Sequence, residues 1–266
     1  MSGFNLFPQR IVCLTEEPVE WLYLLGEEDR IAGVSCYVKR PTHRKKHPIT
    51  SAFTDANLKK ICDMKPDLVI GHSDIQKDIA KNLVERGLNV FIANHRSLEE
   101  TLNYLELLGR MVGKEELARE KIRSYKLKMK SFSERARELK SSPKVYLEEW
   151  NEPMICGIRY FSEVFRTVGA TDIFADISDK GVLAKDRFVD WTRVCELKPD
   201  LFLGCWCGKA LDKESVRQRF HVGETILKNE EDIIELPPEI FLQPGPALFE
   251  EGLDLAYHIV EGWTKR

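Results

Sequence analysis

A ten-residue segment occurs twice in this chain, and this repeat restricts the possible folds more than any other feature. Residues 62–71 read CDMKPDLVIG, and residues 195–204, which lie 133 positions later, read CELKPDLFLG. Each copy has the pattern of a helix end, a proline that stops the helix, a short apolar strand and a glycine that opens a loop. The repeat therefore predicts two similar α/β halves with a ligand-binding cleft between them.

Short apolar runs alternate regularly with amphipathic segments in the first half of the chain. Such alternation is typical of a parallel sheet that is covered by helices. We expect strands over residues 10–14, 31–35, 68–71 and 89–93, and helices over residues 17–25, 57–64 and 75–86. In the second half we expect strands over residues 144–149, 201–204, 233–236 and 240–242, and helices over residues 160–168, 191–197 and 246–263.

A long helix is predicted between the two halves. Residues 115–140 include no Gly or Pro, and apolar residues recur there at alternating steps of four and three. This stripe predicts one helix of about 26 residues, or about 40 Å, and it is too short to favour a coiled-coil seam. We predict an N-terminal α/β lobe over residues 1–108, a connecting helix over 109–141 that acts as a stiff hinge, and a C-terminal α/β lobe over 142–266.

Composition and charge exclude some classes of protein. A net charge of −3 and a pI near 6.1 argue against nucleic-acid binding that is dominated by phosphate contacts. The sequence has neither the pattern of a signal peptide nor a long uncharged apolar stretch, so it predicts no membrane segment. Seven cysteines, an odd number, fit a reducing compartment better than a disulfide scaffold. We therefore expect a cytoplasmic protein.

One strongly basic tract, residues 39–47, reads KRPTHRKKH. A run of this kind is either a solvated loop or a contact for an anionic ligand or partner, and the sequence leaves both interpretations open.

Several motifs resemble the family of substrate-binding proteins for iron-siderophores, haem and vitamin B12, over about residues 9 to 262. They are IVCL after Arg10, LLGEEDRIAGV at residues 24–34, both KPDL segments, GATDIF at residues 169–174, and Gly245-Pro246. The resemblance implies two Rossmann-like lobes with parallel sheets, joined by a backbone helix. It also implies a soluble binding protein, without turnover, for a corrinoid such as cobalamin or for an iron or other metal chelate.

The chain departs from this family at two positions. Members that deliver cargo to an ABC transporter present one exposed Glu on each lobe, which pairs with arginines of the membrane subunits. The corresponding positions here hold Lys59 and Thr192. Because a lysine repels an arginine, docking to an ABC transporter is doubtful on this evidence. The resemblance then favours cytosolic relatives that are described as cobalamin-binding, with a scavenging, storage, handover or sensing role.

Candidate ligand-binding residues follow the predicted strands, because loops after the carboxyl ends of parallel strands face the ligand crevice. In the first lobe they are Thr15, Glu16, Cys36, Tyr37, His72, Ser73 and His95. In the second lobe they are Trp150, Cys156, Arg159, Tyr160, Cys205, Trp206, Cys207, Lys209 and Gln243.

Each type of candidate also has a structural interpretation. His72 either caps a backbone group or binds a metal. Trp150 and Trp206 either fill a core or stack on a ligand. Arg159 and Lys209 either form surface salt bridges or bind an anionic group of the ligand.

A metal site is a further hypothesis, with His72, Cys205 and Cys207 as candidate ligands and Cys36 or Cys156 as possible additions. The Cys-x-Cys spacing is shorter than that of structural zinc sites, and such cysteines more often pack in a core. The alternative function is a metal- or thiol-dependent cytosolic enzyme, although no known catalytic motif occurs. A third hypothesis is a regulatory protein whose own side chains fill the cleft.

Overall fold

The computed structural model describes residues 6–222, 227 and 229–266. The chain forms two compact units, each of which contains one sheet. The first unit comprises Met1–His95 and Glu99–Ser124, and the second comprises Arg96–Leu98 and Tyr125–Arg266. The predicted α/β fold is therefore confirmed. The division falls inside one long helix, whereas the sequence predicted a separate connecting segment at residues 109–141.

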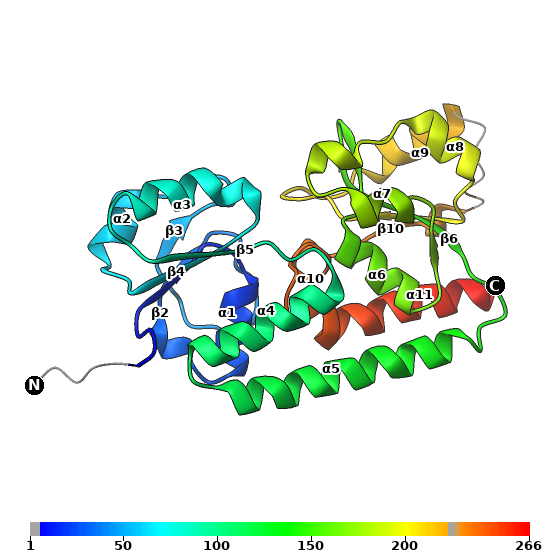
Figure 1. Cartoon of the computed structure of the whole chain (residues 1–266). Helices are drawn as coiled ribbons and strands as arrows, with labels where there is room; N and C mark the ends of the chain where they lie inside the picture. The colour runs from blue at the N-terminus through cyan, green and yellow to red at the C-terminus, as the bar shows by residue number, and fades with distance from the viewer. Residues whose placement is uncertain (1–5, 223–226, 228) are drawn as a thin grey trace, which may run out of the picture. The chain divides into compact units, whose positions relative to one another are not determined.

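The sheet of the first unit is parallel throughout, as predicted. Its strand order is β3 (Ile49–Ser51), β2 (Ile31–Ser35), β1 (Ile11–Cys13), β4 (Leu68–His72) and β5 (Val90–Ala93). The helices are α1 (Glu17–Leu24), α2 (Leu58–Asp63), α3 (Lys77–Val84) and α4 (Leu98–Met111), with short 3-10 turns η1 (Glu28–Arg30) and η2 (Asp74–Gln76). Helices α2 and α3 lie on one face of the sheet, and α1 and α4 on the other (Figure 1).

Packing explains this arrangement of helices in the first unit. Ile61 of α2 and Leu83 of α3 pack with Val12 and Val69 of the two central strands in one buried cluster. On the other face, the indole Nε1 of Trp21 in α1 donates to a carbonyl of α4 at 2.8 Å. Because parallel strands in the middle of such a sheet have two buried faces, the central strand β1 is apolar throughout, and β4 is free of polar side chains up to His72.

The sheet of the second unit has the order β10 (Ile233–Glu235), β9 (Leu201–Gly204), β6 (Lys144–Asn151) and β7 (Met154–Cys156), and β8 (Thr171–Asp172) also pairs with β6. The pairings of β10 with β9, β9 with β6 and β6 with β8 are parallel, as predicted, and β7 adds an antiparallel strand beside β6. Only Glu152 and Pro153 separate the two strands, and a connection this short can join antiparallel strands but not parallel ones.

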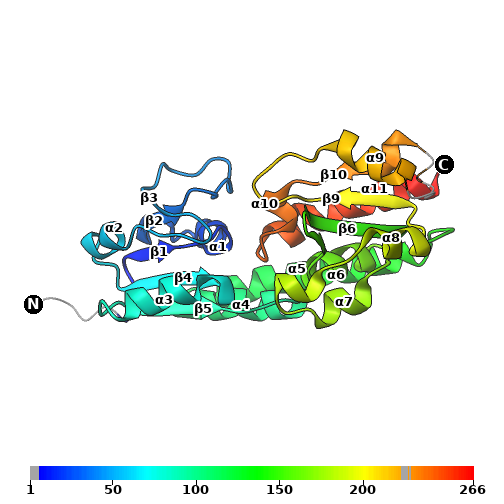
Figure 2. The ribbon, with the colours of Figure 1, turned by 90° about the horizontal axis from the view of Figure 1, so that it is seen from above.

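Helices cover both faces of this second sheet. Helices α8 (Trp191–Leu197) and α9 (Lys213–Val222) lie on one side, and α6 (Arg159–Thr167) and α11 (Leu253–Thr264) on the other (Figure 1). Figure 2 shows β10, β9 and β6 side by side in this sheet. The remaining elements are α7 (Ala175–Lys180), α10 (Pro238–Phe241), η3 (Ala184–Arg187), η4 (Glu230–Asp232) and the π-helical turn η5 (Leu248–Gly252). The strand predicted over residues 240–242 is wrong, because consecutive prolines at 237 and 238 start a helix instead.

The sequence repeat is also a structural repeat. In each copy the lysine that precedes the proline has a left-handed backbone, with φ of 47° at Lys65 and 51° at Lys198. Each lysine follows a short helix and turns the chain into the strand beside the central strand of its sheet. The two lysines therefore end equivalent helices, α2 and α8, in the same way.

The aspartate of each copy joins two neighbouring strands. Asp67 Oδ1 accepts a hydrogen bond from the backbone N–H of Arg10 at 2.9 Å, just before β1. Asp200 Oδ2 accepts one from the backbone N–H of Lys144 at 2.8 Å, at the start of β6. The repeated Lys-Pro-Asp segment thus sets the register of the central strand pair in both units.

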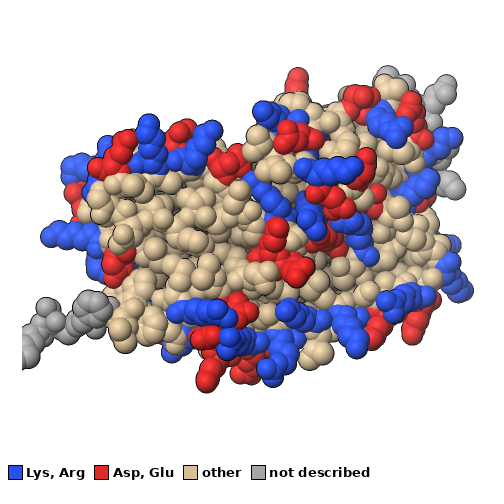
Figure 3. Space-filling view, viewed as in Figure 1, with Lys and Arg blue, Asp and Glu red and all other residues tan. Residues whose placement is uncertain are grey.

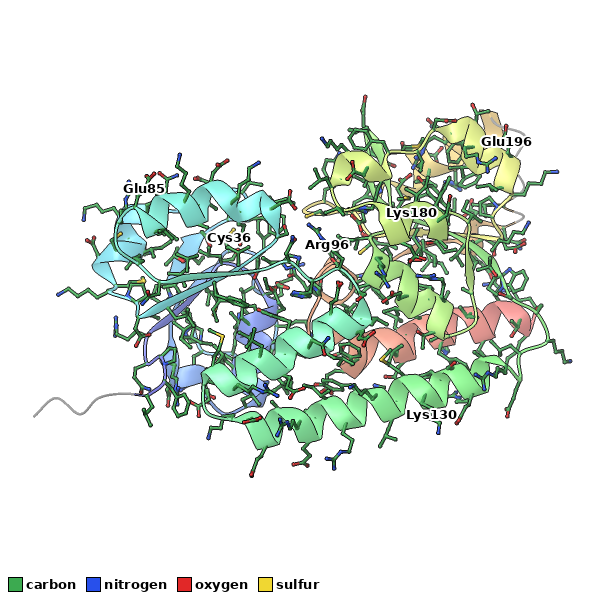
Figure 4. The ribbon with its side chains drawn as sticks, viewed as in Figure 1. Cys36, Glu85, Arg96, Lys130, Lys180 and Glu196 are labelled. Atoms are coloured by element: carbon green, nitrogen blue, oxygen red, sulfur yellow. The ribbon has the colours of Figure 1, made fainter. Side chains whose placement is uncertain are left out.

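Helix α5 (Glu115–Ala136) is the long helix that the sequence predicted, although it has 22 residues and not about 26. Ile122, Tyr125 and Phe132 form its buried stripe. Charged side chains of both signs line its outer surface (Figure 3), and Lys130 points away from the protein (Figure 4). The alternating four- and three-residue spacing of apolar residues in the sequence predicted this amphipathic pattern.

Candidate functional site

Two aromatic residues lie at the carboxyl ends of the central strands in the second unit. Trp150 is near the end of β6, and Trp206 follows the end of β9 by two residues. These strands are parallel, with Glu148 opposite Gly204, so both strand ends lie at the same edge of the sheet. The sequence reasoning that placed candidates after strand ends is consistent with this geometry.

A lysine lies against both indole rings. The Nζ of Lys209 is 4.3 Å from the ring centroid of Trp150 and 4.6 Å from that of Trp206. It also donates to Asn151 Oδ1 at 2.8 Å. Cation–π contacts of this kind contribute about 0.5–1 kcal/mol each at exposed sites. We call Trp150, Asn151, Trp206 and Lys209 the Trp–Lys face.

The members of the Trp–Lys face differ in exposure. Trp206 is 2% exposed, whereas Trp150 is half-buried and Lys209 is exposed. The face therefore combines a fixed inner ring with an accessible outer ring and an accessible cation. Both interpretations of the tryptophans hold in part, because Trp206 packs in the core and Trp150 retains accessible surface.

A buried carboxylate lies beneath this face. Glu148 on β6 is fully buried, and its Oε1 accepts a hydrogen bond from Trp206 Nε1 at 3.0 Å. Its Oε2 accepts one from the Tyr146 hydroxyl at 2.9 Å, and Arg219 of α9 donates to both oxygens at 2.9 Å. Sequence reasoning did not select Glu148 or Arg219 as site residues.

The thiols of the second unit are mostly packed. Cys205 and Cys156 are buried, and burial raises the pKa of the Cys156 thiol to about 12 and that of Cys205 well above its ordinary value. Burial therefore disfavours the thiolate form of both residues, which is the reactive form. Cys207 is exposed. Within the described ranges, no group of three or more His, Cys, Asp or Glu side chains is placed to hold a metal ion, so nothing here supports the predicted metal site.

Three further candidates of the second unit have structural partners. Arg159 Nε donates to Glu163 Oε1 at 2.8 Å, which matches the salt-bridge interpretation. The Tyr160 hydroxyl donates to the carbonyl of Leu242 at 3.2 Å. The carbonyl of Gln243 accepts from the backbone of Gly245. None of these contacts connects the three residues to the Trp–Lys face.

In the first unit, the candidates that follow β1 are buried. The Thr15 hydroxyl donates to Glu17 Oε1 at 2.6 Å, and Glu16 Oε1 accepts from the backbone N–H of Lys39 at 2.7 Å. Burial raises the pKa of Glu17 to about 7 from its ordinary value of 4.5. Sequence reasoning missed Glu17, whose position in the first turn of α1 predicts only a favourable charge at a helix start.

The two candidate histidines of the first unit pack against each other. The ring centroids of His72 and His95 are 4.6 Å apart, edge to face, and His95 stacks on Tyr104 of α4 at 4.3 Å. All three residues are at most 6% exposed. Tyr104 was not predicted, although its place on the buried stripe of α4 is visible in the sequence. The three rings, which we call the His–Tyr cluster, are part of the core.

Ser73 and Gln76 hold the backbone after β4. Ser73 has φ of 62°, and its hydroxyl accepts from the backbone N–H of Ile75 at 3.4 Å. Gln76 Oε1 accepts from the backbone N–H of His72 at 2.9 Å, and its Nε2 donates to the carbonyl of Phe53 at 3.0 Å. This network makes the predicted site residue Ser73 part of a rigid turn.

Cys36 and Tyr37 are the accessible candidates of the first unit. They follow β2, and both are exposed (Cys36 is labelled in Figure 4), with Tyr37 at 46%. Tyr37 therefore has an accessible aromatic surface, and its contact with a ligand stays a prediction.

The basic tract at residues 39–47 is held against α1. Arg40 pairs with the buried Glu20 at 2.8 Å. The Tyr23 hydroxyl contacts His47 Nε2 at 2.9 Å and accepts from the backbone N–H of Lys45 at 2.7 Å. The tract is thus an anchored loop, and its contact with an anionic ligand or partner stays a prediction.

The comparison with protein families gives a match to the periplasmic binding protein family over residues 11–225. An uncharacterised ABC transporter substrate-binding lipoprotein of Bacillus subtilis (strain 168) is 25% identical over 261 residues, which cover 95% of this chain and 80% of that protein. The vitamin B12-binding protein of Vibrio cholerae is 25% identical over 199 residues, which cover 70% of this chain and 71% of that protein.

Solved structures show the same fold. The periplasmic vitamin B12 binding protein of Vibrio cholerae has a TM-score of 0.75 and 18% identity, and the match covers 97% of this chain and 99% of that one. A periplasmic haem-binding protein of Pseudomonas aeruginosa has a TM-score of 0.78 and 17% identity, and the match covers 96% of this chain and 94% of that one. All of these relatives are named as binding proteins and not as enzymes.

Two predictions about location and partners need correction. The prediction of a cytoplasmic protein is wrong, because the relatives are described as periplasmic proteins or as a lipoprotein, which points to a location outside the cytoplasm. The doubt about docking to an ABC transporter is not supported either, since one relative is named as an ABC transporter substrate-binding protein. In the part of the chain that the structure describes, no helix is long and apolar enough to cross a membrane.

The two positions behind that doubt are exposed. Lys59 on α2 pairs with Asp63 at 2.6 Å, and Thr192 lies at the equivalent place on α8. The fold, the internal repeat and the match over most of the chain agree. The chain belongs to the periplasmic binding protein family.

Proposed function

We propose that this protein binds a flat metal chelate or a corrinoid, without transforming it, and that the Trp–Lys face contacts this ligand. The observation that carries the proposal is the contact of one ammonium group with two indole rings at the carboxyl edge of a sheet. An indole face stacks on a delocalised ring, and an ammonium group pairs with carboxylate or phosphate groups at the edge of such a ligand. Haem and the corrinoids combine these two features.

The named relatives support this ligand class. Those that have an assigned ligand bind vitamin B12 or haem. The enzyme alternative has less support, because the named relatives are binding proteins and because burial disfavours the thiolate forms of Cys156 and Cys205. Cys36 and Cys207 are the exposed thiols among the candidates. A binding protein needs no reactive group, and the Trp–Lys face offers stacking area and charge.

Titration of the purified protein with hydroxocobalamin, haem and ferric citrate, followed by visible absorption and calorimetry, tests the proposal. We expect saturable binding of at least one probe with one ligand per chain. Replacement Trp150→Ala should weaken that binding about tenfold, or about 1.4 kcal/mol, through loss of stacking. Trp263→Ala on α11, remote in sequence from this edge, is the matched control and should leave the affinity unchanged. Binding of none of the probes, or equal affinity in all three proteins, contradicts the proposal.

A further inference from the structure

The buried carboxylate of Glu148 accepts hydrogen bonds from four side-chain donor groups, none of which takes part in the backbone pairing of the sheet. Its two oxygens accept hydrogen bonds from an indole, a phenol and both terminal nitrogens of a guanidinium group. A fully buried carboxylate is costly unless donors surround it, and the four donor groups here come from three side chains, those of Tyr146, Trp206 and Arg219. The carboxylate therefore ties together parts of the unit that are distant in the sequence.

The position of Glu148 on β6 explains which groups it reaches. Tyr146, Glu148 and Trp150 alternate along one strand, so they share a face of the sheet, although the pairing with β7 shifts register between the last two. Trp150 packs against the same buried cluster as Tyr146 and Trp206. Glu148 thus lies between Tyr146 and Trp150 along β6, beneath the Trp–Lys face.

Arg219 completes the site from helix α9. Its guanidinium group donates to both Glu148 oxygens and also lies 5.3 Å from the ring centroid of Trp191 and 5.6 Å from that of Phe202. A bidentate pair of this kind has a fixed geometry, which in turn fixes the direction in which the remaining lone pairs of Glu148 point. One of those directions is occupied by Trp206 Nε1.

We infer that Glu148 is a positioning residue for ligand binding. Together with Arg219, it fixes the orientation of the Trp206 indole ring within the Trp–Lys face. This inference rests on the proposed function. Lys209 contacts the ring that Glu148 orients, so a rotation of Trp206 also displaces the ammonium group. Glu148 itself is fully buried, so it acts on the face through Trp206.

Three variants separate positioning from general stability. Glu148→Ala removes the acceptor of Trp206 and leaves Arg219 without its counter-ion. Glu148→Gln keeps one acceptor oxygen for the indole but loses the charge. Asp172→Asn is the matched control, because Asp172 is a buried acid of the same unit that accepts from Ser162, Ser178 and the backbone of Phe174 and not from the Trp–Lys face.

The readouts are the thermal midpoint, the affinity for hydroxocobalamin or haem, and the NMR resonance of the Trp206 indole N–H, assigned with Trp206→Phe. All three variants should lower the thermal midpoint. We expect Glu148→Ala to shift the indole resonance and to weaken binding at least tenfold, and Glu148→Gln to have an intermediate effect on both. Asp172→Asn should leave both unchanged. If Glu148→Ala does not fold, Glu148→Gln alone tests the inference, through the indole resonance and the affinity.

The inference fails if the Glu148 variants resemble Asp172→Asn, with a lower midpoint but an unchanged indole resonance and unchanged affinity. The proposed function can fail separately. If the unmodified protein binds neither hydroxocobalamin nor haem, the proposed function is wrong, and the indole resonance in the Glu148 variants alone tests whether Glu148 positions Trp206.

Discussion

The carboxyl edges of the two sheets carry different kinds of side chain on the same scaffold. In the first unit, the polar residues after β1, β4 and β5 are buried and in contact with one another, as in the His–Tyr cluster and in the hydrogen bond between Thr15 and Glu17, and the exposed residues are Cys36 and Tyr37 after β2. In the second unit, the strand ends carry two tryptophans and an exposed lysine above a buried ion pair. The repeat therefore preserves the strand pair and its register, while the residues just beyond the strands are free to differ.

The largest effect is expected from Trp206→Ala. Removal of a buried tryptophan leaves a cavity and an unsatisfied Glu148 oxygen, which should lower the free energy of unfolding by about 3–5 kcal/mol. Urea unfolding followed by circular dichroism measures this loss. A loss below about 1 kcal/mol would contradict the role of Trp206 in the core of the second unit.

The next effect concerns Glu17 in the first unit. Its raised pKa means that the native state keeps a proton that the unfolded chain has already lost, so stability should fall as the pH rises from 4.5 to about 7 and then level off. The full difference is about 3 kcal/mol for a shift of this size. Glu17→Gln should remove this part of the pH dependence and be the more stable protein at pH 8. Parallel stability profiles for the two proteins would argue that Glu17 is ionised in the fold.

A matched pair of substitutions compares the two copies of the repeat. Asp67 accepts from two backbone N–H groups, of Gln9 and Arg10, whereas Asp200 accepts from that of Lys144. At about 1 kcal/mol for each such bond, Asp67→Ala should cost about 2 kcal/mol and Asp200→Ala about half as much. Equal losses in the free energy of unfolding, measured by chemical denaturation, would show that the additional hydrogen bond of Asp67 adds no stability.

The smallest effect is expected for His72→Ala, measured as ligand affinity. The His72 ring is buried against His95, so its removal should change the affinity for hydroxocobalamin or haem less than about threefold, which is below about 0.7 kcal/mol. Loss of a visible absorption band in this variant would instead show direct contact between His72 and a ligand metal.

Much of the scaffold was predictable from local signals. The bounds of β2, α8 and β9 agree with those predicted, because β2 and β9 are short apolar runs and α8 is a helix that Asp190 caps and that ends just before Pro199. The sequence did not predict strand β7 or helix α10. Strand β7 depends on a two-residue connection, and helix α10 depends on the helix-starting prolines at 237 and 238. Propensity within a short apolar run does not separate these outcomes.

The Trp–Lys face was predictable in part, and the ion pair beneath it was not. Trp150 directly follows the strand predicted over residues 144–149, and Trp206 and Lys209 follow β9, so the sequence alone places all three near strand ends. Glu148 and Arg219 are 71 positions apart, and their contact exists only after α9 has packed on the sheet. Buried ion pairs of this kind have no signature in a single sequence, because each partner alone looks like a surface charge.

Indole N–H resonances provide the most direct measurement of the central claim, that the second unit binds a flat ligand through its aromatic edge. In a titration with hydroxocobalamin, or with the haem analogue zinc protoporphyrin if that binds instead, the account predicts shifts at Trp150 and Trp206 that saturate with the bound fraction. Trp21, which is buried between α1 and α4 of the first unit, should remain unshifted. Saturable binding that leaves the resonances of Trp150 and Trp206 unchanged would contradict the account.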